Sequence, residues 1–490
     1  MSIQSVNPRS GEQFGPLFAS TTSGEIDRMI AAATSSFGTW SHMAGIDRAR
    51  ILGSLADALD ANVERLADMA ESETGLGKVR LVGEIGRTTF QIRSFAEALT
   101  RGEFVSAKLD GVVDAPLPQG HPKFLRTHRG IGPVAVFGAS NFPFAFSVLG
   151  GDTAAALAAG CSVIIKAHPA HPQTSQLTFD IASKALTDAG APAGLIGLGH
   201  GFEFGKEVIT DPRIKAGAFT GSRSGGRALF DLAQSRHTPI PFYGELGSVN
   251  PVVVTESALA DVTAFVGTYL DSLLLGNGQF CTNPSLLFVP ANPDFLAQVR
   301  SQLVAREPLP FLSEPTKSLH DKNRELLVKS TDAVIYSGKP VPEVGFYSSP
   351  EVLVLTAEQV AADPGKLSVE CFGPTGVIIT YSSIREVEEI LAQLEGALVG
   401  CLFSAPTDSS VGSLLNALAS MSGRVAFNSW PTGVAVTTGQ HHGGPYPAAT
   451  SPLHTSVGIN AMTRFLRPVT FQGVPDELYK TVTLDKVKGQ

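Results

Sequence analysis

Apolar side chains in the first hundred residues follow the spacing of a helix. They recur every three or four positions, as at Ile26, Ile30, Ala33 and Phe37. Residues at this spacing share one face of a helix, so residues 21–99 are predicted to be mostly helical. The pattern changes near residue 131, where shorter apolar runs begin.

From residue 131 onward, these short apolar runs alternate with helical stretches. One series of runs covers residues 133–137, 162–166, 195–198 and 216–219, and a second covers residues 251–254, 286–289, 376–381 and 398–405. Strands that alternate with helices favour parallel sheets covered on both faces. Because 490 residues are too many for one core, we predict an α/β fold with two doubly wound α/β domains.

Two segments fall outside these series. Residues 104–129 are rich in Asp, Gly and Pro, and they are predicted to form a hairpin that projects from the first domain. Residues from about 465 onward are expected to run as an extended tail against it. The predicted division is therefore 1–103 with 130–246 for the first domain, 247–464 for the second, and 104–129 with 465–490 for a β-flap that serves oligomerisation.

Charge and composition exclude several classes of protein. A formal net charge of −8 and a pI near 5.8 argue against nucleic acid as a partner. The N-terminus lacks the pattern of a signal peptide. We also expect no membrane span, because Asp152 and several glycines interrupt the most apolar stretch of the chain. The four cysteines have no C-x-x-C spacing, which favours a reducing cytoplasm and indicates neither a disulfide framework nor a metal site.

Cys281 is a candidate nucleophile. It follows the run Gly276-Asn-Gly-Gln-Phe, whose two glycines allow a tight loop before the strand predicted at residue 286. A lone cysteine is more often a small buried hydrophobic residue. The position of Cys281 alone therefore leaves both interpretations open.

Glu245 and Asn141 each follow an apolar strand. Glu245 is flanked by Gly244 and Gly247, and loss of water at such a place would raise its pKa and suit it to act as a general base. An ordinary strand-end salt bridge is the alternative. Asn141 could donate its side-chain amide to an oxyanion, although a turn asparagine would look the same.

Two further strand ends are candidate ligand sites. Lys166 ends the strand predicted at residues 162–166, at the carboxyl edge where open α/β sheets bind ligands. The turn after Phe219 places Gly221 and Ser222 before a helix, where backbone N–H groups can hold a pyrophosphate. A capped helix alone would explain this turn equally well. The G-x-G-x-x-G fingerprint of a standard Rossmann site is absent.

Six motifs, taken together and in this order, resemble the aldehyde dehydrogenase superfamily over nearly the whole chain: Asn141, Lys166, the 219–222 turn, Glu245, Cys281 and Glu370-Cys-Phe-Gly-Pro. The resemblance implies that Cys281 is the nucleophile and Glu245 the general base. It also implies that the side chain of Asn141 and the backbone N–H of Cys281 form an oxyanion hole. The product would be a carboxylate released from a thioester, with no metal required.

The same resemblance implies a nicotinamide cofactor bound by the first domain, and a catalytic second domain. Lys166 would bind the adenosine ribose, Ser222 with Gly221 the pyrophosphate, and Glu370 with Phe372 the nicotinamide end. We expect NADP rather than NAD, because no acid follows Lys166 that would repel a 2′-phosphate. NAD is the alternative.

Four further sequence runs resemble one branch of this superfamily: Lys166-Ala-His-Pro-Ala-His-Pro, Pro239-Ile-Pro-Phe-Tyr-Gly-Glu-Leu-Gly, Asn428-Ser-Trp-Pro-Thr-Gly-Val and Gln440-His-His-Gly-Gly-Pro-Tyr-Pro. This branch contains 2-oxoglutarate semialdehyde (2,5-dioxopentanoate) dehydrogenases and a bacterial fatty aldehyde dehydrogenase. We expect the oxo-acid aldehyde as substrate, with a fatty or other aliphatic aldehyde as the alternative. An anionic tail needs a cationic partner. Arg93 is the candidate, with Gln91 and Ser456 as neutral donors, although an arginine on such a helix usually faces solvent or an acid.

Two other functions remain open. A thiol hydrolase could use the same cysteine, carboxylate and oxyanion donor without a dinucleotide, but it leaves Lys166, Ser222 and Glu370 unexplained. A non-catalytic relative need not retain the three catalytic candidates together. The flap and the resemblance imply a homodimer or homotetramer.

Overall fold

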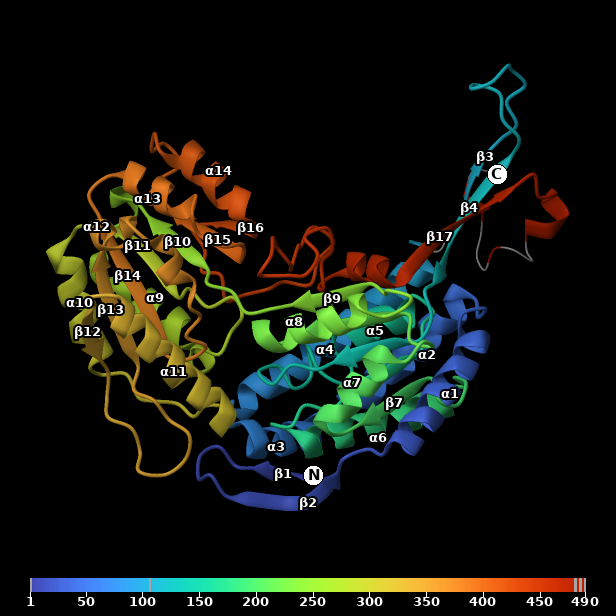
Figure 1. Ribbon diagram of the computed structural model, residues 1–490, viewed down its shortest axis with the longest axis horizontal. Helices are drawn as coiled ribbons and strands as arrows, with labels where there is room; N and C mark the ends of the chain where they lie inside the picture. Colours follow the sequence, from blue (N-terminus) through green and yellow to red (C-terminus); the bar gives the residue numbers. More distant parts are fainter. Residues whose placement is uncertain (1, 105–106, 480–482, 484–486, 489–490) are drawn as a thin grey trace.

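The computed structural model describes residues 2–104, 107–479, 483 and 487–488. Figure 1 shows two lobes, each built around one sheet, and a flap that projects from the first lobe. Residues 105–106 of the predicted hairpin and residues 480–482, 484–486 and 489–490 of the predicted tail lie outside the described part. The α/β fold class predicted from the alternating pattern is confirmed.

The first lobe contains a five-stranded parallel sheet in the order β7-β6-β5-β8-β9. Its strands are β5 (Val134–Phe137), β6 (Val163–Lys166), β7 (Ile196–Gly199), β8 (Ala216–Thr220) and β9 (Phe242–Glu245). The chain first proceeds outward from β5 through β6 to β7, and then returns to add β8 and β9 on the other side of β5. The carboxyl ends of β5 and β8 therefore mark the switch point at which such sheets bind ligands.

Helices cover both faces of this sheet because successive side chains on each strand point to opposite faces. Val134 and Val136 pack towards α5 and α6, whereas Ala135 and Phe137 pack towards α1 and α7. The helices of the first lobe are α1 (Ser23–Trp40), α2 (Gly45–Asp60), α3 (Val63–Thr74), α4 (Lys78–Thr100), α5 (Gly151–Ala158), α6 (Pro172–Asp188), α7 (Phe202–Thr210) and α8 (Arg223–Gln234). The predicted helical segment at residues 21–99 is confirmed as α1 to α4.

The second lobe contains a seven-stranded sheet in the order β12-β13-β14-β11-β10-β15-β16, parallel except for the β12–β13 pair. Its strands are β10 (Pro251–Val254), β11 (Leu286–Pro290), β12 (Val334–Ser337), β13 (Glu351–Thr356), β14 (Thr375–Tyr381), β15 (Ala397–Phe403) and β16 (Ser422–Phe427). The helices that accompany them are α9 (Val262–Leu274), α10 (Pro293–Leu303), α11 (Glu314–Ser330), α12 (Ala357–Ala361), α13 (Ile384–Leu391) and α14 (Val411–Met421). Two apolar cores, one on each face, make this sheet doubly wound as well.

Several strands do not belong to the series expected from the sequence. The hairpin of β1 (Ser2–Val6) and β2 (Gln13–Ala19) precedes the helical segment, and β12, β13 and β16 extend the second sheet at its two sides. β12 and β16 are edge strands with mixed burial, so they lack the continuous apolar run of a central strand. β13 is apolar, but only the five-residue α12 follows it, so the strand–helix rhythm is weak there.

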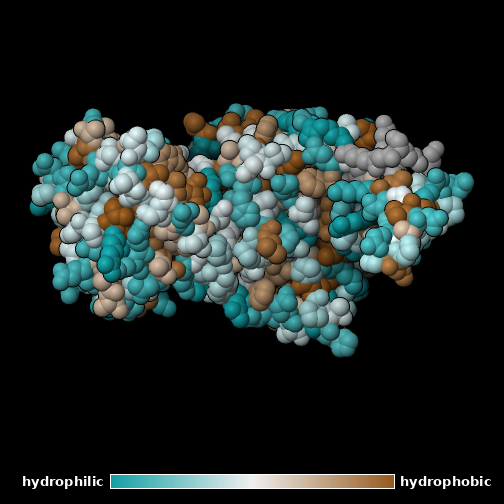
Figure 2. All heavy atoms as spheres, turned by 90° about the horizontal axis from the view of Figure 1, so that it is seen from above, coloured by the Kyte–Doolittle hydropathy of each residue, from teal (hydrophilic) through white to brown (hydrophobic). Residues whose placement is uncertain are grey.

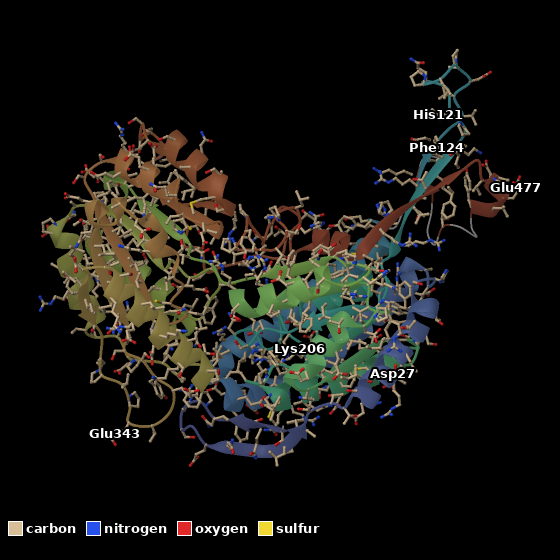
Figure 3. The ribbon with its side chains drawn as sticks, in the orientation of Figure 1. Asp27, His121, Phe124, Lys206, Glu343 and Glu477 are labelled. Atoms are coloured by element: carbon tan, nitrogen blue, oxygen red, sulfur yellow. The ribbon has the colours of Figure 1, made fainter. Side chains whose placement is uncertain are left out.

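The flap is a four-stranded sheet in the order β17-β4-β3-β18. The predicted hairpin forms from β3 (Ala107–Asp110) and β4 (Phe124–Gly130), and β17 (Leu466–Gln472) runs antiparallel to β4, as expected for the tail; β18 (Val487–Lys488) pairs with β3. Figure 3 labels His121 and Phe124 on the projecting hairpin. The domain limits expected from the sequence stay predictions. No helix in the described residues combines the length and apolarity needed to cross a membrane.

Candidate active site

A cavity of about 760 Å³ opens at the carboxyl edge of the five-stranded sheet and reaches the second lobe. Eight of the side chains or turns singled out in the sequence line this one cavity: Asn141, Lys166, Gly221, Ser222, Glu245, Cys281, Glu370 and Phe372. They come from both lobes and span more than two hundred residues of sequence. The structure thus brings together every predicted catalytic residue and every predicted cofactor residue.

The loop that carries Cys281 is held in an unusual backbone conformation. Gly276, Asn277 and Gly278 follow one another with φ values of 57°, 62° and 69°. A side chain at position 278 would collide with the carbonyl of Gly373, so only glycine allows this approach. Asn250 fixes the other end of the loop, because its Nδ2 donates to the carbonyl of Cys281 at 2.8 Å.

The Cys281 thiol is protonated in the resting site. Burial, together with the negative charges of Glu245 and Glu370, raises its pKa to about 12. The other cysteines are free and buried, and none of them lines the cavity. Cys281 therefore needs a base close by before it can act as a nucleophile.

Glu245 ends β9 and is buried beside the thiol. Burial raises the pKa of its carboxyl group to about 8, whereas the hydroxyl of Ser456 lowers it. Asp152 raises the same pKa and Arg464 lowers it, and these two residues form a buried ion pair at 2.8 Å. A carboxyl group with a pKa near 8 is well suited to exchange protons around neutral pH.

His442 stands between the nucleophile and the carboxylate, and the sequence did not single it out as a site residue. Its Nε2 lies 3.8 Å from Sγ of Cys281 and 3.3 Å from Oε2 of Glu245. Burial lowers the pKa of the imidazole to about 3, and Arg424 and Arg87 lower it as well, so the ring is neutral. The only signal in the sequence is the His-His pair at residues 441–442, which gives no distance to Cys281.

Arg80, on α4, connects the loops of Asn141 and Cys281. Its Nη2 donates to the backbone carbonyl of Asn141 at 2.7 Å. Its guanidinium lies between two rings, 5.1 Å from the centroid of Phe142 and 4.7 Å from that of Phe280. These rings directly follow Asn141 and directly precede Cys281. One side chain therefore sets the spacing between the oxyanion donor and the nucleophile.

The side-chain amide of Asn141 is buried in the same place. Its Nδ2 donates to the carbonyl of Gln279 at 2.9 Å, which fixes the orientation of the amide close to the Cys281 loop. The turn that carries Asn141 is held from α4 as well, since Glu84 accepts hydrogen bonds from the backbone N–H groups of Phe144 and Ala145. This preorganisation is what an oxyanion hole requires.

The far end of the cavity has the features of a dinucleotide site. Ser222 caps the N-terminus of α8, and its hydroxyl accepts from the N–H of Gly225 at 3.3 Å. Burial lowers the pKa of Lys166 to about 8, and its Nζ donates to the carbonyl of Ala167. A helix N-terminus beside a lysine suits a pyrophosphate and its ribose.

Glu370 and Phe372 border the cavity near Cys281. Burial raises the pKa of Glu370 to about 7, and its Oε1 accepts from the backbone N–H of Ser248 at 3.2 Å. A Cβ at position 247 would collide with the Glu370 carboxylate where it now lies, so a larger residue there would displace that side chain. The residues present therefore fit a dinucleotide, with Lys166, Ser222, Glu370 and Phe372 lining one cavity.

The candidate substrate residues do not assemble as expected. Arg93 is outside the cavity lining: its guanidinium is at the surface of α4, paired with Asp57 at 2.6 Å and Asp60 at 2.7 Å. Gln91 and Ser456 are buried behind the lining, with Ser456 against Glu245. The expectation that Arg93 binds the substrate is corrected, because its guanidinium is paired with two acids at the surface and does not line the cavity.

Comparison with known proteins agrees with this arrangement. The model of the aldehyde dehydrogenase family matches residues 1–467, and the chain belongs to this family. The alpha-ketoglutaric semialdehyde dehydrogenase of Acinetobacter baylyi is 37% identical over 99% of this chain and 93% of its own length. Alpha-ketoglutaric semialdehyde dehydrogenase 2 of Azospirillum brasilense is 38% identical over 97% of this chain and 92% of its own length.

Solved structures show the same fold. The aldehyde dehydrogenase KauB from Pseudomonas aeruginosa superposes with a TM-score of 0.82 at 21% identity, over 96% of this chain and 93% of that one. PnpE in complex with nicotinamide adenine dinucleotide gives a TM-score of 0.81 at 22% identity, over 97% of this chain and 95% of that one. The protein is an oxidoreductase that acts on an aldehyde with a nicotinamide cofactor, and the hydrolase alternative is not supported.

Proposed function

We propose that the protein oxidises 2-oxoglutarate semialdehyde to 2-oxoglutarate through a thioester on Cys281. The observation that carries the reaction is the group formed by Cys281, His442 and Glu245 beside the amide of Asn141. The substrate is supported by two relatives that bear the name alpha-ketoglutaric semialdehyde dehydrogenase and match nearly the whole chain.

In the first half of the reaction, Sγ of Cys281 bonds to the aldehyde carbon. The thiol proton leaves to the carboxylate of Glu245, directly or through one water, while the carbonyl oxygen takes up the negative charge. The Asn141 amide and the Cys281 backbone N–H stabilise this oxyanion. A bound nicotinamide dinucleotide would accept the hydride that leaves the same carbon. Lys166, Ser222 and Glu370 would hold that dinucleotide in the cavity.

In the second half, Glu245 first passes the thiol proton to solvent, and it then takes a proton from water while the resulting hydroxide attacks the thioester. The carbon–sulfur bond breaks and Cys281 leaves as a thiolate, which takes up the proton. Nε2 of neutral His442 lies within 4 Å of both Glu245 and the sulfur atom. It can therefore form a hydrogen bond with one of them at a time and change from one to the other. The base therefore stays close to the reacting groups in both halves.

For the cofactor, we propose a preference for NADP. Lys166 and Lys206 line the far part of the cavity, and no acid among the described residues lines it between Lys166 and Lys206. Figure 3 shows Lys206 in the first lobe. A 2′-phosphate would gain from the charge of Lys166, and from that of Lys206 in exchange for its surface ion pair with Glu203 at 2.9 Å. The test compares kcat/KM for NADP and NAD with the same aldehyde, and a higher value with NAD would contradict the preference.

We further propose that the flap joins two or four copies of the chain. It projects from the body and exposes Val112, Val113 and Leu117, and Figure 2 shows hydrophobic residues at that end of the molecule, on the right of the view. Sedimentation of the full chain would distinguish a monomer from a homodimer or homotetramer. The four free cysteines support a reducing compartment such as the cytoplasm.

The central experiment is an aldehyde panel with purified enzyme. We expect 2-oxoglutarate semialdehyde to give a higher kcat/KM than pentanal, which has the same carbon number but no charge, and than a long aliphatic aldehyde. Reduction of the cofactor measures the rate. A preference for the long aliphatic aldehyde would contradict the proposed substrate and favour the fatty aldehyde alternative.

A further inference from the structure

Two half-buried arginines lie next to the cavity, and neither has a carboxylate within ion-pair distance, although the negative charges of Glu84 and Glu245 raise the pKa of Arg87 against the effect of burial. Arg87 is on α4 and Arg424 is on β16, and within the described residues neither forms an ion pair. Both lie outside the lining of the cavity itself. An arginine stays charged in proteins, and a partly buried cation without an acid is unfavourable unless another anion compensates it.

Both arginines bind the same loop. Arg424 donates through Nη2 to the carbonyl of Pro431 at 2.5 Å and through Nη1 to that of Gly433 at 2.6 Å. Arg87 donates through Nη2 to the carbonyl of Val434, at the long distance of 3.5 Å. Arg424 therefore uses both Nη atoms to order the loop, whereas Arg87 is only weakly engaged by it.

Aromatic and imidazole rings connect Arg87 to the catalytic group. Its Cζ lies 5.2 Å from the ring centroid of Phe146, which is 5.9 Å from the ring of His442. Phe146 and His442 line the cavity together with Cys281. The positive charges of Arg87 and Arg424 both act on the Cys281 thiol and lower the pKa of His442.

The length of the proposed substrate limits where its partner can lie. Four carbon–carbon bonds separate the aldehyde carbon from the carboxylate carbon, a span of about 5 Å. The partner must therefore come from side chains that surround Cys281. Arg93 is six residues further along α4 and is held by Asp57 and Asp60.

We propose that Arg87 binds the carboxylate of the aldehyde substrate, and that Arg424 positions the 431–434 loop against it. This inference rests on the proposed function, since it assigns the recognition of the anionic tail to a residue of the same site. Arg87 provides a planar fork of N–H donors, which matches a carboxylate or a 2-oxo acid better than an ammonium group does.

The test is the kinetics of Arg87→Met, which keeps an unbranched side chain beside Phe146 but removes the charge. We expect kcat/KM for 2-oxoglutarate semialdehyde to fall about 10- to 100-fold, mainly through KM, while pentanal changes less than about threefold. Arg87→Lys should recover part of the loss. Arg93→Gln, on the same helix, is the matched control and should leave both aldehydes unchanged.

A second measurement covers the case in which Arg87→Met does not fold. The product 2-oxoglutarate should inhibit pentanal oxidation by competing for the tail site, and Arg87→Lys should weaken this inhibition about tenfold. For Arg424→Lys, which acts through the loop, we expect a higher KM for the oxo acid with an unchanged kcat. Equal losses for the charged and uncharged aldehydes, or no loss for either, would overturn the role of Arg87.

The outcomes separate this inference from the proposed function. If the wild-type enzyme prefers another anionic aldehyde and Arg87→Met loses that preference, the proposed substrate is wrong and the role of Arg87 stands. If the wild-type enzyme prefers 2-oxoglutarate semialdehyde and Arg87→Met keeps that preference, the proposed substrate stands and the role of Arg87 is wrong. A wild-type preference for pentanal over all anionic aldehydes would overturn both.

Discussion

The two sides of Cys281 are built in different ways. The proposed cofactor side is built largely from strand ends and glycine turns of the first sheet, since Lys166 ends β6 and the Gly221–Ser222 turn follows β8, and the second lobe adds Glu370 and Phe372. The base Glu245 ends β9 of the same first sheet. The other side is formed by the interior of α4, the edge strand β16 and the irregular loops at residues 431–434 and 441–442. The first kind of site depends on the topology of the sheet, and the second on how distant segments pack.

This difference has a consequence for what each side can do. Strand ends and helix N-termini offer backbone groups that suit any dinucleotide, so they change little when the aldehyde changes. Side chains on a helix and in loops can be replaced without altering the sheet. We therefore expect variants of the central group to abolish the reaction, and variants of α4 to change its rate or its substrate.

The largest effect is expected for Cys281→Ala. No thioester can form without the sulfur atom, so oxidation should fall by about 10⁴-fold or more. Dinucleotide binding, measured by quenching of protein fluorescence, should stay within about twofold, because the groups proposed to hold it are elsewhere in the cavity. Residual dehydrogenase activity near the wild-type level would contradict a nucleophilic role for Cys281.

Glu245→Gln should affect mainly the hydrolysis of the thioester, by about 10²- to 10³-fold. We expect a burst of reduced cofactor followed by slow turnover. In the wild-type enzyme the steady-state rate should rise with pH through about 8, because Glu245 acts as a base only after it loses its proton and burial raises its pKa to about 8. The variant should lack this rise. The burst itself should be slower than in the wild-type enzyme, because Glu245 also takes the thiol proton. Loss of the burst altogether would mean that formation of the thioester depends on Glu245 as strongly as its hydrolysis does.

Arg80→Met should lower kcat about tenfold with little change in KM. It removes the hydrogen bond to the Asn141 carbonyl and the charge between Phe142 and Phe280, so the oxyanion donor and the nucleophile lose their fixed spacing. Arg80→Lys keeps the charge near the rings but loses the planar fork, and should be intermediate. A change confined to KM would contradict a positioning role for Arg80.

The contrast between the two sides also explains what the sequence could predict. Strand periodicity followed by a glycine or a charged residue is a local signal, and it identified Lys166, the Gly221–Ser222 turn and Glu245. The positions of His442, Arg80 and Arg87 depend on contacts with residues far away along the chain, such as the 3.8 Å approach of His442 to Cys281. Helical spacing places Arg87 and Arg93 about 120° apart on α4. It does not tell which of the two arginines faces the cavity or which acids lie beside each one.

Arg93→Gln should have the smallest effect. The guanidinium is at the surface, and Asp57 and Asp60 already compensate its charge at 2.6 and 2.7 Å. Exposed ion pairs of this kind stabilise proteins by about 1 kcal/mol or less, so the melting temperature should fall only slightly. We expect kcat/KM to stay within about twofold of wild type for 2-oxoglutarate semialdehyde and for pentanal alike. A selective loss for the oxo acid in this variant would show that the anionic tail is recognised at the outer end of α4, and would reverse the distinction between Arg87 and Arg93.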